Sequence, residues 1–150
     1  MKVTCPVCGT GKAKVVKQPY QAKYNGEIVV LPSVEMFHCD SCGEEFFAPG
    51  QAKALSIAVK NEVRRKLGLL PPEKIVAIRE KLDLTQSDLE RLLDLGQKVV
   101  TRWESGRVVQ PSTADTILRM LDRDPKGLST LKEIEKLREQ AQRKSDFVHA

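Results

Sequence analysis

The chain has 150 residues, of which 41% are hydrophobic, so it can build one medium domain or two small ones. Its net charge of +5 is unevenly distributed: residues 1–50 are neutral overall, residues 51–110 carry a net +4 and residues 111–150 a net +1. The basic middle segment favours a polyanion partner, although a solvated basic face would give the same excess of positive charge. No apolar run approaches the length of a membrane span and residues 2–9 lack the apolar core of a signal peptide, so we expect a cytoplasmic protein without a membrane segment.

Residues 1–50 are predicted to form a small β-rich domain. The β-prone runs are Val15–Val16, Ile28–Leu31 and Val34–Phe37. Asn25-Gly26 tolerates the positive φ angles that a two-residue hairpin turn requires. Pro32-Ser33 is expected to mark a second turn.

Two identical C-x2-C-G units, thirty residues apart, predict a metal site in this domain. Its four ligands would be Cys5, Cys8, Cys39 and Cys42. A two-residue gap lets one tight turn present two thiolates to the same side of an ion, and the glycine after each second cysteine relaxes that turn. Two such units close a tetrahedral shell, so we predict one structural Zn2+ per chain.

The four cysteines could instead form a redox dithiol or two disulfides. A redox motif would need a single C-x-x-C in a βαβ setting, which the sequence lacks, and a reducing compartment disfavours disulfides. His38 adjoins Cys39 and could compete as a ligand, but we expect it to be a strand residue that points away. His149 is expected in a frayed C-terminal tail.

Residues 51–72 are predicted to be a helix and linker. The helix, expected over residues 52–67, has its apolar side chains roughly on one face: Ala54, Ile57, Ala58 and Val63. Gly68 is a plausible helix terminus, and Pro71-Pro72 breaks the chain. The predicted domains are therefore residues 1–50 and residues 73–150.

Residues 73–150 are predicted to form an all-α domain, which makes the fold class α+β. Apolar stripes mark the first, second and last helices: Ile75, Ile78 and Leu82; Leu89, Leu92 and Leu93; Leu131, Ile134 and Leu137. Thr85 and Asp88 form a capping box at the start of the second helix. Further helices are expected over residues 97–105, 112–123 and 128–144.

The segment from residue 84 to residue 106 resembles the phage-repressor-like (Xre-type) helix-turn-helix family. Two motifs carry the resemblance: Leu84-Thr85-Gln86 and Thr101-Arg102-Trp103-Glu104-Ser105-Gly106. It implies that the third helix enters the major groove of DNA. Two positions depart from the pattern, because Asp94 stands where many members have glycine and Glu90 where they have a small residue. A helical bundle used only for protein contacts is the alternative.

Five residues are the candidates for DNA contact: Gln86, Gln97, Lys98, Thr101 and Arg102. Gln86, at a helix N-terminus, suits a phosphate. Lys98 and Arg102 can donate to guanine, and Gln97 can pair with adenine. Glu104 would be repelled by DNA, and we expect it to hold Arg79 or another local cation.

Over about residues 1–125, the chain resembles the MqsA antitoxin family with its YgiT-type zinc finger. The resemblance lies in the order of the motifs along the chain: CPxCG, hairpin, CxxCG, helix and helix-turn-helix. The resemblance implies an antitoxin whose zinc domain binds a small, RNase-type toxin. It also implies a homodimer, formed through the C-terminal domain, that represses its own operon on double-stranded operator DNA. The family's base-reading positions fall on Lys98, where asparagine is common, and on Arg102.

A stand-alone zinc-braced transcriptional regulator is the second hypothesis. An enzyme such as a zinc hydrolase is disfavoured, because the predicted metal shell is closed and no nucleophile–base pair is evident.

Overall fold

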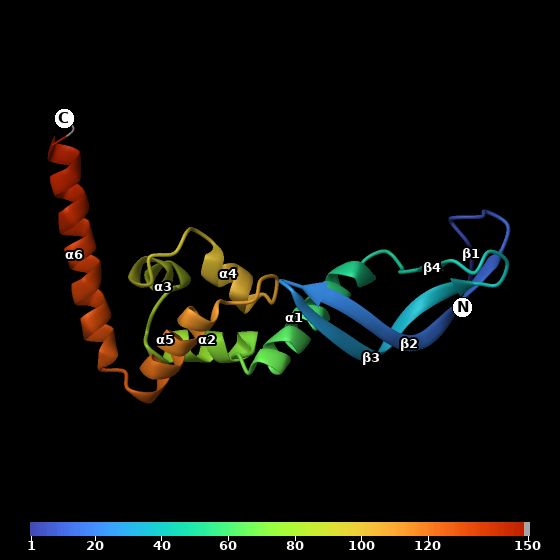
Figure 1. Ribbon diagram of the computed structural model, residues 1–150, viewed down its shortest axis with the longest axis horizontal. Coiled ribbons are helices and arrows are strands. Elements are labelled where there is room, and N and C mark those ends of the chain that lie inside the picture. The colour runs from blue at the N-terminus through green and yellow to red at the C-terminus, as the bar shows by residue number, and fades with distance from the viewer. Residues whose placement is uncertain (149–150) are drawn as a thin grey trace. The chain divides into compact units, whose positions relative to one another are not determined.

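The computed structural model describes residues 1–148 and divides into two compact units, Met1–Leu67 and Gly68–Ala150. The first unit contains all the strands and one helix, and the second contains only helices (Figure 1). The α+β prediction is therefore confirmed. His149 lies outside the described residues. Within them, no helix is both long and apolar enough to cross a membrane.

The first unit is an antiparallel sheet in the order β1-β2-β3-β4. Its elements are β1 (Lys2–Thr4), β2 (Lys12–Tyr24), β3 (Glu27–Cys39), β4 (Glu45–Phe46) and α1 (Gln51–Leu67). The long β2–β3 hairpin turns at Asn25 and Gly26, whose φ angles are +48° and +83°. This turn is the one predicted, and it sets the register that brings Ala13 opposite Cys39.

The second turn expected at Pro32-Ser33 was wrong, because β3 runs through both residues without a break. The register shifts at this point, since Gln18 pairs with Val34 while Tyr20 pairs with Leu31. Proline has no N–H to donate, so it is tolerated where a bulge already interrupts the ladder.

Helix α1 packs against β3 and β2 and so belongs to the first unit. Val59 and Val63 are buried, whereas Ala54 of the expected apolar face is exposed. Lys66 fastens the end of the helix to the hairpin, through Glu27 at 2.8 Å and the carbonyl oxygen of Ile28 at 3.1 Å. The sequence predicts a helix and linker over residues 51–72; in the structure the helix α1 lies within the compact unit that ends at Leu67.

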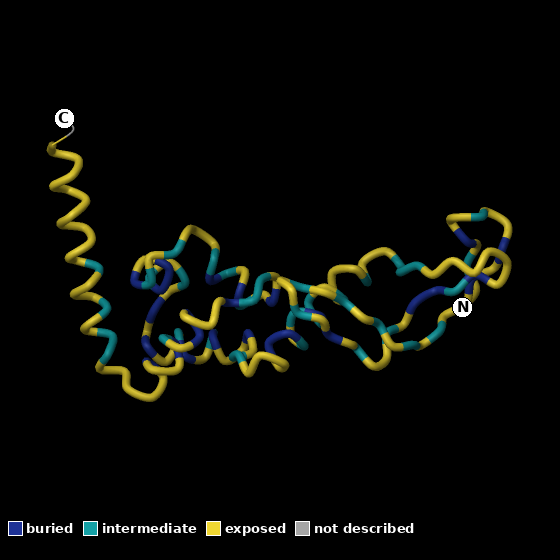
Figure 2. The backbone as a smooth tube through the Cα atoms, in the orientation of Figure 1, coloured by how far each residue is buried: buried dark blue, intermediate teal, exposed yellow. Residues whose placement is uncertain are grey.

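The second unit packs five helices: α2 (Pro72–Lys81), α3 (Gln86–Leu92), α4 (Val99–Glu104), α5 (Ser112–Arg123) and α6 (Gly127–Val148). Its core includes the predicted stripes of the first two helices, together with Val100, Trp103 and Leu118. No residue of α6 is buried, and its tube is exposed or half-buried along its whole length (Figure 2). Of its predicted stripe, Leu131 packs against the core while Leu137 is exposed.

Candidate metal centre and DNA-binding surface

The four cysteines converge at one end of the sheet. Their Sγ atoms all lie within 4.8 Å of one another. Cys5 Sγ is 3.8 Å from Cys42 Sγ, and Cys8 Sγ is 3.8 Å from Cys39 Sγ, so each contact joins the two C-x2-C units. A tetrahedron with metal–sulfur bonds of about 2.3 Å has edges of about 3.8 Å. The sulfur atoms are therefore spaced to hold one metal ion.

The backbone of each unit supports this spacing. Gly9 and Gly43 have φ angles of +72° and +74°, and their N–H groups donate to the carbonyl oxygens of Cys5 and Cys39. Positive φ at both positions is the role expected for the glycine after each second cysteine, and few other residues adopt it cheaply.

Backbone N–H groups also point at sulfur. Gly11 N–H donates to Cys8 Sγ at 3.3 Å, and Ser41 N–H donates to Cys39 Sγ at 3.4 Å. The backbone at Thr10 and Gly11 lowers the pKa of the Cys8 thiol to about 6. This shift favours the thiolate of Cys8, the form that binds metal, whereas the other cysteines help to raise the pKa of the Cys42 thiol to about 12.

Gly11 is a site residue that sequence reasoning missed. A Cβ atom placed on it would lie 2.5 Å from Cys39 Sγ and 2.8 Å from Ser41 Cβ. Only glycine therefore lets β2 start beside the sulfur cluster. The signal was present in the sequence as a further glycine, two residues after the first C-x2-C-G unit.

His38 is not part of the cluster formed by the described residues. Its Nδ1 lies 3.5 Å from Glu45 Oε1 on the neighbouring strand β4. This placement agrees with the strand role expected for it.

Helices α3 and α4 form the helix-turn-helix of the second unit. Thr85 and Asp88 make the predicted capping box, because Asp88 N–H donates to Thr85 Oγ1 at 3.0 Å and Thr85 N–H donates to Asp88 Oδ2 at 2.9 Å. Asp94 takes a φ of +56° in the turn that follows α3. The aspartate therefore adopts the left-handed conformation that glycine provides in many family members.

The expected start of the third helix at Gln97 was wrong, because α4 begins at Val99. Lys98 precedes it in the left-handed conformation, with a φ of +64°, and its side chain does not cap the helix. Glu90 takes over that role from α3, where its Oε1 accepts a hydrogen bond from the buried Val100 N–H at 3.0 Å. The glutamate that departs from the family pattern thus satisfies one of the free N–H groups of α4.

Glu104 holds Arg79, as expected, and it also orders Gln86. Its carboxylate accepts from Arg79 Nε at 2.6 Å and Arg79 Nη2 at 3.1 Å, and from Gln86 Nε2 at 2.6 Å. Thr101 Oγ1 donates to Gln86 Oε1 at 2.9 Å. The Arg79–Glu104 ion pair raises the pKa of Arg79 above its usual value, chiefly through the hydrogen bonds that Arg79 donates to Glu104.

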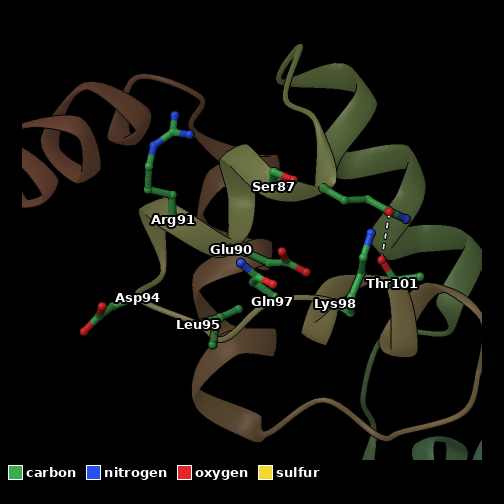
Figure 3. A pocket seen from close by; sticks show the side chains of 9 residues that line it. Ser87, Glu90, Arg91, Asp94, Leu95, Gln97, Lys98 and Thr101 are labelled. Carbon is green, nitrogen blue, oxygen red and sulfur yellow. Dashed lines mark hydrogen bonds between the residues drawn. The ribbon is translucent and has the colours of Figure 1, made fainter.

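The structure places four of the five candidate DNA contacts on one groove between α3 and α4 (Figure 3). They are Gln86, Gln97, Lys98 and Thr101. Arg102 is exposed on α4 but does not line this groove. Arg91, which was not predicted as a site residue, also lines this groove and forms ion pairs with Asp88 and with Glu135 of α6. No local sequence pattern indicates the contact with Glu135, because the two residues are far apart in the sequence.

A small sheet with four converging cysteines and a separate helix-turn-helix unit define a class of metal-braced regulators. The family described as the antitoxin component of a bacterial toxin–antitoxin system, MqsA, matches residues 1–134. The chain therefore belongs to the MqsA antitoxin family, which favours an antitoxin over a stand-alone regulator.

Two curated relatives agree with this assignment. Antitoxin MqsA of Escherichia coli strain K12 is 26% identical over 129 residues, which cover 85% of this chain and 98% of that protein. Antitoxin HigA-2 of Vibrio cholerae serotype O1 is 34% identical over 65 residues, or 43% of this chain and 62% of that protein.

Proposed function

We propose that this antitoxin divides its work between the two units: the first binds a small RNase-type toxin, and the second binds operator DNA and represses the operon. The observation that carries the proposal is that each compact unit has its own site. The sulfur cluster lies wholly within residues 1–67, and the groove between α3 and α4 lies wholly within residues 68–150.

The metal we propose is one structural Zn2+ per chain. An all-sulfur donor set with two sulfur–sulfur distances of 3.8 Å, and all four atoms within 4.8 Å of one another, suits zinc in tetrahedral coordination. Four thiolates leave no position for a reacting water, so the ion would brace the end of the hairpin and perform no chemistry.

For the second unit we propose Gln97, Lys98 and Arg102 as base-edge contacts, and Gln86 as a phosphate contact. The first three side chains are exposed at the start of α4 or along it. We further propose that the protein dimerises through this unit. Two copies of α4 would then lie about 34 Å apart and read a palindromic operator.

Two variants, each expected to disable one unit, test the division. Cys39→Ser removes a metal ligand and should abolish capture of the toxin encoded by the neighbouring gene while leaving operator binding largely intact. Arg102→Ala should cost roughly 1–3 kcal/mol of specific DNA binding and leave toxin capture unchanged.

Both activities should be measured on the same zinc-loaded preparations, by co-purification with the toxin and by DNA titration. Toxin capture by Cys39→Ser equal to that of the parent protein would contradict the role of the first unit. Equal loss on operator and random DNA in Arg102→Ala would make that residue a phosphate contact.

A further inference from the structure

A series of hydrogen-bonded side chains, which begins inside the second unit, determines whether the Thr101 hydroxyl donates or accepts a hydrogen bond. Arg79 and Glu104 are its first members, and their side chains are only 13% and 7% exposed. Glu104 Oε1 pairs with Arg79 Nε at 2.6 Å, and a carboxylate in such an ion pair can only accept hydrogen bonds. Glu104 therefore accepts from every group that touches it.

The next member, Gln86, has one possible orientation beside such an acceptor. Its Nε2 must face Glu104 Oε2, 2.6 Å away, because two oxygen atoms at that distance would repel. Its Oε1 consequently faces Thr101 Oγ1 at 2.9 Å. The dashed line of Figure 3 marks this contact. An amide oxygen has no proton to donate, so the Thr101 hydroxyl is the donor.

A hydroxyl has one proton, and that of Thr101 is already used. What Thr101 can present to the groove is the lone pairs of Oγ1 and its methyl group. The groove is also lined by Gln97 and Lys98, which are exposed beside it.

We propose that Thr101 is a specificity-determining residue that acts as a hydrogen-bond acceptor, and that it selects a base with an exocyclic amino group. In the major groove that group is N6 of adenine or N4 of cytosine, whereas the hydrogen-bonding groups of guanine and thymine there are all acceptors, and thymine adds only its methyl group. Glu104 acts through Gln86 as a positioning residue, since it prevents the amide from turning over. This inference rests on the proposed DNA-binding function of the second unit.

The test uses the full, zinc-loaded chain. Selection from a randomised duplex library first yields the preferred site, and binding is then measured with each base pair of that site changed singly. We expect one base pair at which replacing adenine or cytosine with guanine or thymine costs about tenfold in affinity. Thr101→Val, which has the same shape without the hydroxyl, should abolish this discrimination, and Thr101→Ser should keep it.

Ratios between sequences cancel any uniform loss of affinity, so weaker folding of Thr101→Val does not mimic the expected result. Removing only the amino group, with a purine or 2-pyrimidinone nucleotide, should weaken the parent protein and leave Thr101→Val unaffected. Glu104→Gln, which lets Gln86 turn over, should broaden the preference to include guanine.

An unchanged base profile in Thr101→Val would overturn the proposal, as would a discrimination for guanine or thymine that Thr101→Val removes. A library that yields no enriched sequence at all would instead refute the proposed function of the second unit.

Discussion

Replacing Glu90 with alanine sets two expectations against each other. A small residue is common at this position in the helix-turn-helix family, so family pattern alone suggests a neutral change. The structure suggests the opposite, because Glu90 Oε1 accepts the hydrogen bond of Val100 N–H at 3.0 Å and Val100 is fully buried. Alanine would leave that N–H without a partner, since the Lys98 side chain does not cap α4.

The magnitude follows from two opposing terms. A buried N–H without a partner costs about 1–3 kcal/mol. The higher helix propensity of alanine returns about 0.5 kcal/mol. We therefore expect Glu90→Ala to reduce the free energy of unfolding of the second unit by about 0.5–2.5 kcal/mol, or to lower its Tm by roughly 2–20 °C.

Urea and thermal unfolding of the zinc-loaded chain measure this change. Far-UV circular dichroism reports the second unit well, because five of the six helices found in residues 1–148 belong to it. Glu90→Gln is the matched control, since it keeps an acceptor oxygen and should lose less than half as much stability. If Glu90→Ala is as stable as the parent protein, the assignment of Glu90 as the cap of α4 is refuted.

Three further changes test other parts of the molecule. Gly11→Ala should weaken zinc retention in a chelator competition, because its Cβ would lie 2.5 Å from Cys39 Sγ. Gly9→Ala is the control: its Cβ would meet nothing within 4 Å, so its zinc retention should fall only by the cost of the positive φ. Equal loss of zinc retention in both variants would contradict the steric argument. Lys98→Asn should stabilise the second unit by about 0.5–1 kcal/mol, because asparagine tolerates a φ of +64° better than lysine does. The same change should alter the operator preference. A loss of stability in thermal unfolding would count against the first expectation. Burial raises the pKa of Asp115, but hydrogen bonds from the N–H of Leu70 and from neighbouring side chains outweigh burial and hold this pKa below its usual value of 3.8. The stabilisation from the ionised carboxylate is therefore present at neutral pH and should be lost as the pH falls below about 4. An acid titration in which Asp115→Asn unfolds at the same pH as the parent protein would refute this.

Local spacing was enough to predict the cysteine cluster and the hairpin. A C-x2-C-G unit specifies its own turn, and Asn25-Gly26 specifies another. Nothing beyond neighbouring residues is needed for either, so the sequence pattern and the structure agree. Two features that depend on partners distant in sequence were missed: the fit of Gly11 against Cys39 and the bond from Arg91 to Glu135.

Two other differences between the sequence pattern and the structure have the same origin. Pro32-Ser33 has the composition of a turn, but pairing with β2 on the other side of the hairpin carries the strand through it. Helix α1 was expected to be part of a linker because its sequence says nothing about the sheet on which Val59 and Val63 pack. Tertiary contacts override local composition in both segments.

The departures from the helix-turn-helix pattern explain one another when they are taken together. Lys98 takes a left-handed conformation, which costs about 1–2 kcal/mol for most residues and less for asparagine, and it contributes no side-chain cap. A small residue at position 90 would then leave the start of α4 both strained and without a cap. Glu90 supplies the missing acceptor from α3, so the chain can carry a lysine on the groove where the family commonly has asparagine. The two substitutions are therefore expected to be energetically linked, and the double variant Glu90→Ala/Lys98→Asn should be more stable than the sum of the single changes predicts, because asparagine at position 98 can cap the helix that Glu90 no longer caps.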